Sequence, residues 1–301
     1  MPVSTIDYTA IGASDAAGYG ATVTCNTSQN PVEVALPTCP GGTAYVPDIE
    51  RTLAAQPHTK VVLNDLGISG AVVGPKTRAL IDQYGSATSS TPCVPRTGTD
   101  VVPGDFITNE LPSVPANATL VTIFAGGNDT NGIVNAAACM TLAGNEAGVP
   151  AFLATSIAQF GAEFEQLVTG IEAKAPSAKI VVANLPNFAA IPFAQTPEIA
   201  PVKPLLQAVS VGIDTTVYEP AAVAGLPVVD LLCNPASYVT TNFYTDGFHP
   251  DDAGYAVFAT AFVTQILAAT PTLPQTSCSY MAISSGQRRA LQGGIPNFNH
   301  R

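Results

Sequence analysis

Three side-chain types that cooperate in acyl transfer occur in short motifs of this chain: a serine, a histidine and a carboxylate. Ser14 stands in Ile11-Gly12-Ala13-Ser14-Asp15, on a predicted turn among small residues, where its hydroxyl can meet a substrate carbonyl. His249 follows Asp246 by three residues. A serine hydroxyl is a weak nucleophile until a base takes its proton, and histidine is the usual base near neutral pH. A nearby aspartate can hold the imidazole in the required tautomer.

Two further stretches supply hydrogen-bond donors for the oxyanion that such an attack creates. Gly70 ends Leu66-Gly67-Ile68-Ser69-Gly70 and can offer an unhindered backbone N–H group, while Asn128 in Gly126-Gly127-Asn128-Asp129 can offer a side-chain amide. The backbone N–H of Ser14 is a third donor. Removing one donor of this kind typically raises the barrier by about 3 kcal/mol.

Each of these residues also has an ordinary structural interpretation. Gly70 is a common turn residue, and Gly-Gly-Asn-Asp is good turn chemistry for Asn128. Asn128 fits the glycosylation pattern Asn-x-Thr as well, although its place at a strand end disfavours that role. Asp246 can cap the following helix, and His249 beside Pro250 can be a surface residue. The functional interpretation therefore depends on all of these residues meeting at one place.

The hydrophobic pattern predicts elements that would bring them together. Continuous apolar runs predict five strands, ending at residue 12 and over 60–66, 119–125, 178–185 and 227–232. Apolar residues at helical spacing predict helices over 43–56, 75–84, 150–175, 202–218 and 251–268. Alternating strands and helices with continuous apolar strands predict an α/β fold, a parallel sheet covered by helices on both faces.

The motifs follow different strands but leave the same edge of that sheet. Ser14 follows the first strand, Gly70 the second, Asn128 the third and His249 the fifth. Ligands of open parallel α/β sheets bind at the carboxyl ends of the strands, so we expect one shared site. We expect residues 85–118 to form a long surface excursion anchored by Phe106 and Ile107.

Length and composition favour one domain of about 1–280, followed by a flexible tail over 281–301. The 301 residues are 47% hydrophobic and 11% charged, enough for one sizeable core. The net charge of −11 and the lack of basic runs argue against a nucleic-acid partner and against an anionic membrane surface. No apolar stretch reaches the roughly 20 residues of a membrane helix, so we expect no stable membrane insertion. The sequence does not define the oligomeric state.

Six widely spaced cysteines, none in a Cys-x-x-Cys pair, favour disulfides over a zinc site. We expect pairing in sequence order, Cys25 with Cys39, Cys93 with Cys139 and Cys233 with Cys278; the alternative is buried thiols. Disulfides indicate an exported protein, extracellular or periplasmic. No leader is visible before the first strand, so we expect that it has been removed.

The four motifs together resemble the SGNH hydrolases, also called the GDSL esterase/lipase family. The resemblance covers roughly residues 5–270 and implies a three-layer α/β/α sandwich around a mainly parallel five-stranded sheet. It implies Ser14 as nucleophile, His249 as base and Asp246 as its orienter, with Ser14, Gly70 and Asn128 as oxyanion donors. One departure is Ala13, which stands where the family has an aspartate before the serine. We expect another group, such as Asp15, to make the local hydrogen bonds of that turn.

These observations predict a secreted serine esterase that needs no metal or cofactor. The apolar loop Phe188-Ala189-Ala190-Ile191-Pro192-Phe193 can form a wall beside the site, which favours short- to medium-chain acyl esters or a hydrophobic polyester. The alternative substrate is an acetylated polysaccharide, although the chain has no tryptophan to stack on sugars. A non-catalytic binding protein on the same fold is the alternative from another class.

Overall fold

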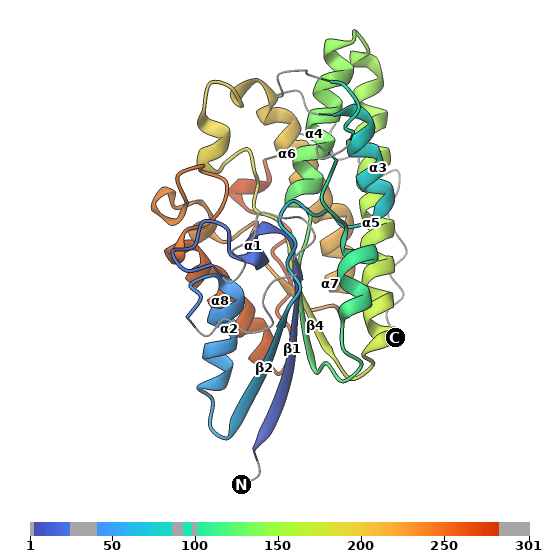
Figure 1. The fold of residues 1–301 in the computed structure, drawn as a ribbon. Helices are drawn as coiled ribbons and strands as arrows, with labels where there is room; N and C mark the ends of the chain where they lie inside the picture. Colours follow the sequence, from blue (N-terminus) through green and yellow to red (C-terminus); the bar gives the residue numbers. More distant parts are fainter. Residues whose placement is uncertain (1–2, 25–40, 86–92, 98–100, 283–301) are drawn as a thin grey trace.

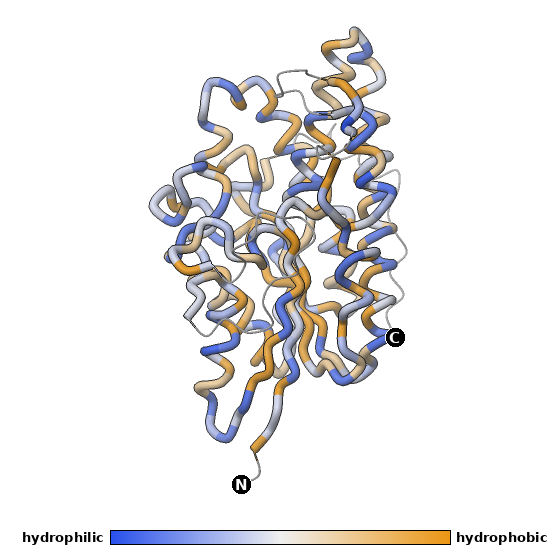
Figure 2. Tube along the Cα trace, in the orientation of Figure 1, coloured by the Kyte–Doolittle hydropathy of each residue, from blue (hydrophilic) through white to orange (hydrophobic). Residues whose placement is uncertain are grey.

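A five-stranded parallel sheet forms the centre of the molecule (Figure 1). This computed structural model describes residues 3–24, 41–85, 93–97 and 101–282. The sheet has the strand order β2-β1-β3-β4-β5. Its strands are β1 (Ser4–Gly12), β2 (Thr59–Asp65), β3 (Leu120–Phe124), β4 (Lys179–Ala183) and β5 (Val228–Val229). Every residue of β3 is buried, in keeping with its mostly apolar sequence, and Figure 2 shows apolar residues concentrated along the central strands.

Helices cover both faces of the sheet, which confirms the predicted three-layer α/β/α fold. On one face α2 (Tyr45–Ala54) packs against α8 (Asp252–Leu267). On the other face lie α3 (Pro75–Tyr84), α4 (Gly127–Leu142), α5 (Val149–Lys174) and α6 (Lys203–Ile213). Two shorter helices are α1 (Ser14–Ala17) and α7 (Glu219–Val223).

The strand order reverses between β1 and β3. From β1 the chain crosses to β2 at one edge of the sheet, and it then returns to pair β3 with the other side of β1. The loops after β1 and β3 therefore diverge at this point and leave a crevice beyond the carboxyl ends of the strands. Ser14 and Asn128 stand on these two loops.

The short helices α1 and α7 and the longer helix α4 were not predicted from the sequence, and two further segments differ from the prediction. Helix α4 begins directly after the Gly126-Gly127 pair, where the sequence suggested only a turn. The predicted helix over 202–218 is α6 followed by a turn of π-helix over Asp214–Tyr218. The region predicted as a surface excursion contains a short π-helix over Phe106–Glu110, in which Phe106 and Glu110 are both buried. Phe106 is an anchor, as expected, but this part belongs to the core.

Two of the three expected disulfides are present. Cys93 is bonded to Cys139 and Cys233 to Cys278, whereas Cys25 and Cys39 lie outside the described residues. Met281 is buried in a small cluster, and residues 283–301, most of the predicted tail, lie outside the described residues. In the described part of the chain, every helix is too short or too polar to cross a bilayer.

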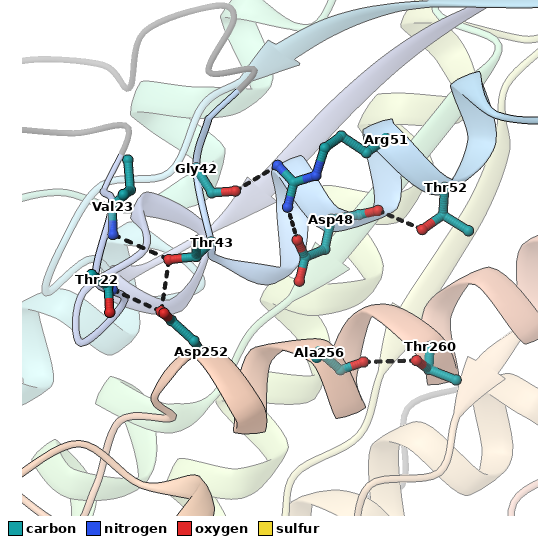
Figure 3. A network of polar contacts seen from close by, with 10 residues as sticks. All are labelled: Thr22, Val23, Gly42, Thr43, Asp48, Arg51, Thr52, Asp252, Ala256 and Thr260. Atoms are coloured by element: carbon teal, nitrogen blue, oxygen red, sulfur yellow. Dashed lines mark hydrogen bonds and ion pairs between the residues drawn. The ribbon is translucent and has the colours of Figure 1, made fainter.

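A polar network ties the start of α8 to two segments on the α2 side (Figure 3). Asp252 Oδ1 accepts a hydrogen bond from the Thr22 backbone N–H at 2.7 Å and another from the Thr43 hydroxyl at 2.6 Å. Nearby, Arg51 pairs with Asp48 on α2. The segment after α1 is therefore fixed to the helix that follows His249.

Candidate active site

The side chains of Ser14, His249 and Asp246 form a continuous hydrogen-bonded chain. His249 Nε2 lies 2.8 Å from Ser14 Oγ, and His249 Nδ1 lies 2.7 Å from Asp246 Oδ2. Ser14 and His249 are 235 residues apart in the sequence. The fold therefore brings together the three residues whose types predicted acyl transfer, each in the order that proton transfer requires.

The loop from Asp246 to His249 holds its own side chains in place. Asp246 Oδ1 accepts hydrogen bonds from the backbone N–H groups of Phe248 and His249, at 2.9 and 3.0 Å. Gly247 has φ +69°, and a Cβ there would lie 2.8 Å from the backbone nitrogen of Phe193, so glycine is required. Burial alone would raise the pKa of Asp246, but the bonds from His249 and the backbone outweigh it and lower the pKa. Asp246 is therefore a carboxylate at neutral pH.

The side chain of Asn128, on the first turn of α4, fixes the loop that follows Gly70. Asn128 Nδ2 donates to the Ala71 carbonyl at 2.9 Å, and Asp129 Oδ1 accepts from the Val73 backbone N–H at 2.9 Å. Asp129 thus bonds the backbone of the same loop. An amide nitrogen carries two hydrogens, so Asn128 keeps a second donor. Gly70 directly precedes Ala71, which lines the same cavity as Ser14 and Asn128.

Ser14 occupies the first position of α1. Its backbone N–H has no acceptor within the helix, because the first N–H groups of any helix lack intrahelical partners. The side chain is nearly buried, with 7% of Ser14 exposed. Ser14 therefore carries a hydroxyl in contact with His249 and a backbone donor at the same point.

Glu110 makes a hydrogen bond at the turn that departs from the family pattern at Ala13. Its Oε2 accepts a hydrogen bond from the Gly12 backbone N–H at 3.0 Å, although the two residues are 98 positions apart in the sequence. Burial raises the pKa of Glu110 well above its usual range. Asp15, which the sequence suggested for this work, instead lies near His249; burial raises its pKa and His249 opposes that rise.

We expect Glu110→Gln to keep most of the stability and Glu110→Ala to lose about 1–3 kcal/mol or more, because only alanine leaves the Gly12 N–H unpaired. Glutamine has the shape of the neutral acid and keeps an accepting oxygen. Urea denaturation of both variants measures the difference. Equal losses in the two variants would mean that the hydrogen bond to Gly12 contributes little.

A small apolar cavity of about 30 Å³ opens beside Ser14 and Asn128. Its aromatic lining residues are Phe124, Phe188, Phe243, Phe248 and Phe258. Phe188 and Ile191 come from the loop that the sequence analysis expected as an apolar wall. A cavity of this volume accommodates a group about the size of one water molecule or one methyl.

Among the described residues, no group of three or more His, Cys, Asp or Glu side chains could hold a metal ion.

Comparison with known proteins identifies the class to which this fold and site belong. The sequence model of the GDSL-like Lipase/Acylhydrolase family matches residues 10–257, most of the chain. The chain belongs to this family, also called the SGNH hydrolases. It is accordingly a carboxylic ester hydrolase. No curated protein matches the chain by sequence.

The chain is also similar to several solved structures, of which the first below supports the fold. The extracellular lipase from Streptomyces rimosus superimposes with a TM-score of 0.54 at 19% identity, over 85% of this chain and 97% of the lipase. The phospholipase A1 from Streptomyces albidoflavus gives 0.48 at 18% identity, over 86% and 98%. An acetylxylan esterase from Geobacillus stearothermophilus gives 0.46 at 15% identity, over 92% and 100%.

The two disulfides are consistent with a secreted protein.

Proposed function

We propose that this protein is a secreted serine esterase that cleaves short-chain acyl esters through an acyl-enzyme on Ser14. The observation that carries the proposal is the hydrogen-bonded chain from Asp246 through His249 to the Ser14 hydroxyl. The position of Ser14 at the carboxyl edge of the sheet, beside an apolar cavity, supports it. The disulfides support the secreted location.

The reaction follows from the positions of these atoms. Ser14 Oγ bonds to the ester carbonyl carbon while His249 Nε2 takes the hydroxyl proton, and Asp246 stabilises the resulting imidazolium. The oxyanion is held by the backbone N–H groups of Ser14 and Gly70 and by the Asn128 amide. The bond to the alcohol oxygen then breaks, and that oxygen leaves with the proton from Nε2. Water repeats these steps on the acyl-enzyme, releasing the acid and restoring the Ser14 hydroxyl.

The cavity limits the acyl group. An apolar space of about 30 Å³ beside the nucleophile accommodates a small acyl group such as acetyl. We therefore favour acetyl and other short acyl groups over long chains or a bulky polyester.

Two measurements test this function. A fluorophosphonate should label the protein once, at Ser14 by mass spectrometry, and hydrolysis of alkyl esters should fall steadily from acetate to octanoate. A protein that neither labels nor hydrolyses any ester is a binding protein on this fold. Fast hydrolysis of octanoate would leave the esterase standing and overturn the short acyl preference.

The Asn128 amide gives a more local test. We expect Asn128→Ala to lower kcat by about 10²- to 10³-fold with little change in KM, because the amide is needed mainly where the oxyanion forms. Asn131→Ala, one turn later on α4, is the control and should keep kcat within about threefold. If both variants retained kcat, Asn128 would only be the residue that holds the Ala71 carbonyl.

A further inference from the structure

Two exposed tyrosines, Tyr19 and Tyr244, lie beside His249. The Tyr19 and His249 ring centroids are 4.5 Å apart, and the Tyr19 and Tyr244 centroids are 5.9 Å apart in an edge-to-face arrangement. Tyr19 is 44% exposed and Tyr244 41% exposed, although large apolar surfaces are usually buried. The hydrogen bonds and pocket of the proposed acyl side do not involve these two rings.

The loop that carries Tyr19 is packed firmly onto the loop of His249. The Tyr255 hydroxyl donates to the Tyr19 carbonyl, and the Tyr244 N–H donates to the His249 carbonyl at 2.8 Å. A Cβ at Gly20, which has φ +91°, would lie 2.6 Å from the Pro250 carbonyl oxygen, so the two loops touch. Asp252 fixes the same segment at Thr22 (Figure 3). Hydrogen bonds and close backbone contacts therefore hold Tyr19 and Tyr244 in place on this surface.

The His249 ring has the cavity beside Ser14 on one side and the exposed ring of Tyr19 on the other. Phe248, whose ring centroid is 5.0 Å from that of His249, lines the cavity beside Ser14. Tyr19 does not line that cavity. During acylation the acyl group stays on Ser14, whereas the alcohol oxygen takes its proton from His249 Nε2. The alcohol must therefore lie against His249 and outside the cavity, where Tyr19 and Tyr244 provide exposed aromatic faces.

We propose that Tyr19 and Tyr244 form the subsite for the alcohol part of the ester, and that they select a six-membered ring carried by that alcohol. The inference rests on the proposed function. A ring presents a flat C–H or aromatic face to a tyrosine ring and loses little conformational freedom on binding, unlike a linear chain. The tyrosine hydroxyls leave a polar edge for ring substituents. With the small acyl cavity, this selects acetyl esters of ring alcohols.

The test compares esters that share the acetyl group and differ only in the alcohol. Cyclohexylmethyl acetate and n-heptyl acetate are both esters of primary alcohols with the same number of carbons, so the ratio of their kcat/KM values isolates the preference for a ring. We expect the wild type to favour the ring ester, and Tyr19→Ala and Tyr244→Ala each to lower this ratio about 5- to 10-fold. Tyr19→Phe and Tyr244→Phe keep the aromatic ring and should leave the ratio near its wild-type value. Val223→Ala, at an exposed position on α7, is the matched control and should leave the ratio at its wild-type value.

The outcomes are distinct from those that test the esterase itself. If the wild type hydrolyses both acetates and the ratio of their kcat/KM values is the same in every variant, the subsite is overturned and the esterase proposal stands. A protein that hydrolyses neither ester overturns both. Benzyl acetate and a monoacetylated methyl xyloside then separate the source of the ring: a larger loss on the xyloside in Tyr19→Ala assigns the subsite to sugars, and a larger loss on the benzyl ester assigns it to aryl alcohols.

Discussion

Replacement of Ser14 by alanine is expected to lower kcat/KM for ester hydrolysis by about 10⁴- to 10⁶-fold. The change removes the oxygen that bonds the carbonyl carbon, and the hydrogen-bonded chain from Asp246 then ends at His249 Nε2 with nothing to activate. Steady-state rates on phenyl acetate, a reactive short-chain ester, give the widest range for measuring this loss. Labelling by a fluorophosphonate should disappear with it.

The Ser14 variant should remain folded, which makes the result interpretable. Alanine is smaller than serine by one oxygen atom, and Ala16 and Ala17 show that this short helix accommodates small residues. The control is Ser156→Ala, which removes another buried serine hydroxyl, one that bonds the Phe152 carbonyl inside α5. Thermal denaturation should give similar midpoints for both variants. Loss of activity in both, or residual activity above a hundredth in Ser14→Ala, would contradict the nucleophile assignment.

Replacement of Asp246 by asparagine is expected to lower kcat by about 10⁴-fold while the loop keeps its shape. The side-chain oxygen is held by the backbone N–H groups of Phe248 and His249, so the new NH₂ group must face His249 Nδ1. Nδ1 then has to accept a hydrogen bond, which places the ring proton on Nε2. An imidazole in that tautomer cannot take the proton of Ser14.

The control for this change is Asp251→Asn, five residues along the chain. Asp251 caps α8 by accepting from the Gly254 N–H at 3.0 Å, and asparagine can do the same. Activity should therefore stay near the wild-type value. A similar modest effect in both variants would show that Asp246 does not set the tautomer.

The pH dependence follows from the same residues. Because its pKa is lowered, Asp246 keeps its charge as the pH falls from 8 to 5. We expect activity to fall toward acidic pH because the base that accepts the Ser14 proton must be unprotonated, and this fall does not come from Asp246. A rate that stays flat down to about pH 4 would contradict the role of His249. Asp246 also contributes to the free energy of unfolding. Because its pKa is lowered in the folded protein, this contribution is present at neutral pH and is lost only as the pH falls through that lowered pKa.

Much of the site was determined by the sequence because strand topology converts order along the chain into position in space. Ser14 and Asn128 each follow an apolar strand, and parallel strands present their carboxyl ends at one edge. The strand and helix pattern was read from hydrophobic periodicity, which is strong wherever an element has one buried face. Helix α4 was missed because it packs against α3, α5 and α6, and its small residues leave no single apolar stripe.

The tertiary structure decided the features that depend on contacts between distant segments. The bond from Glu110 to Gly12 joins residues 98 positions apart, and nothing in a polar, proline-containing stretch indicates that Glu110 is buried. The size of the cavity depends on how aromatic side chains from β3, α8 and two loops pack, and the place of Tyr19 on His249 depends on the turn at Gly20. Residue types and their order thus predicted the proposed chemistry, whereas packing between loops, which has no local sequence signal, set the size of the cavity beside Ser14.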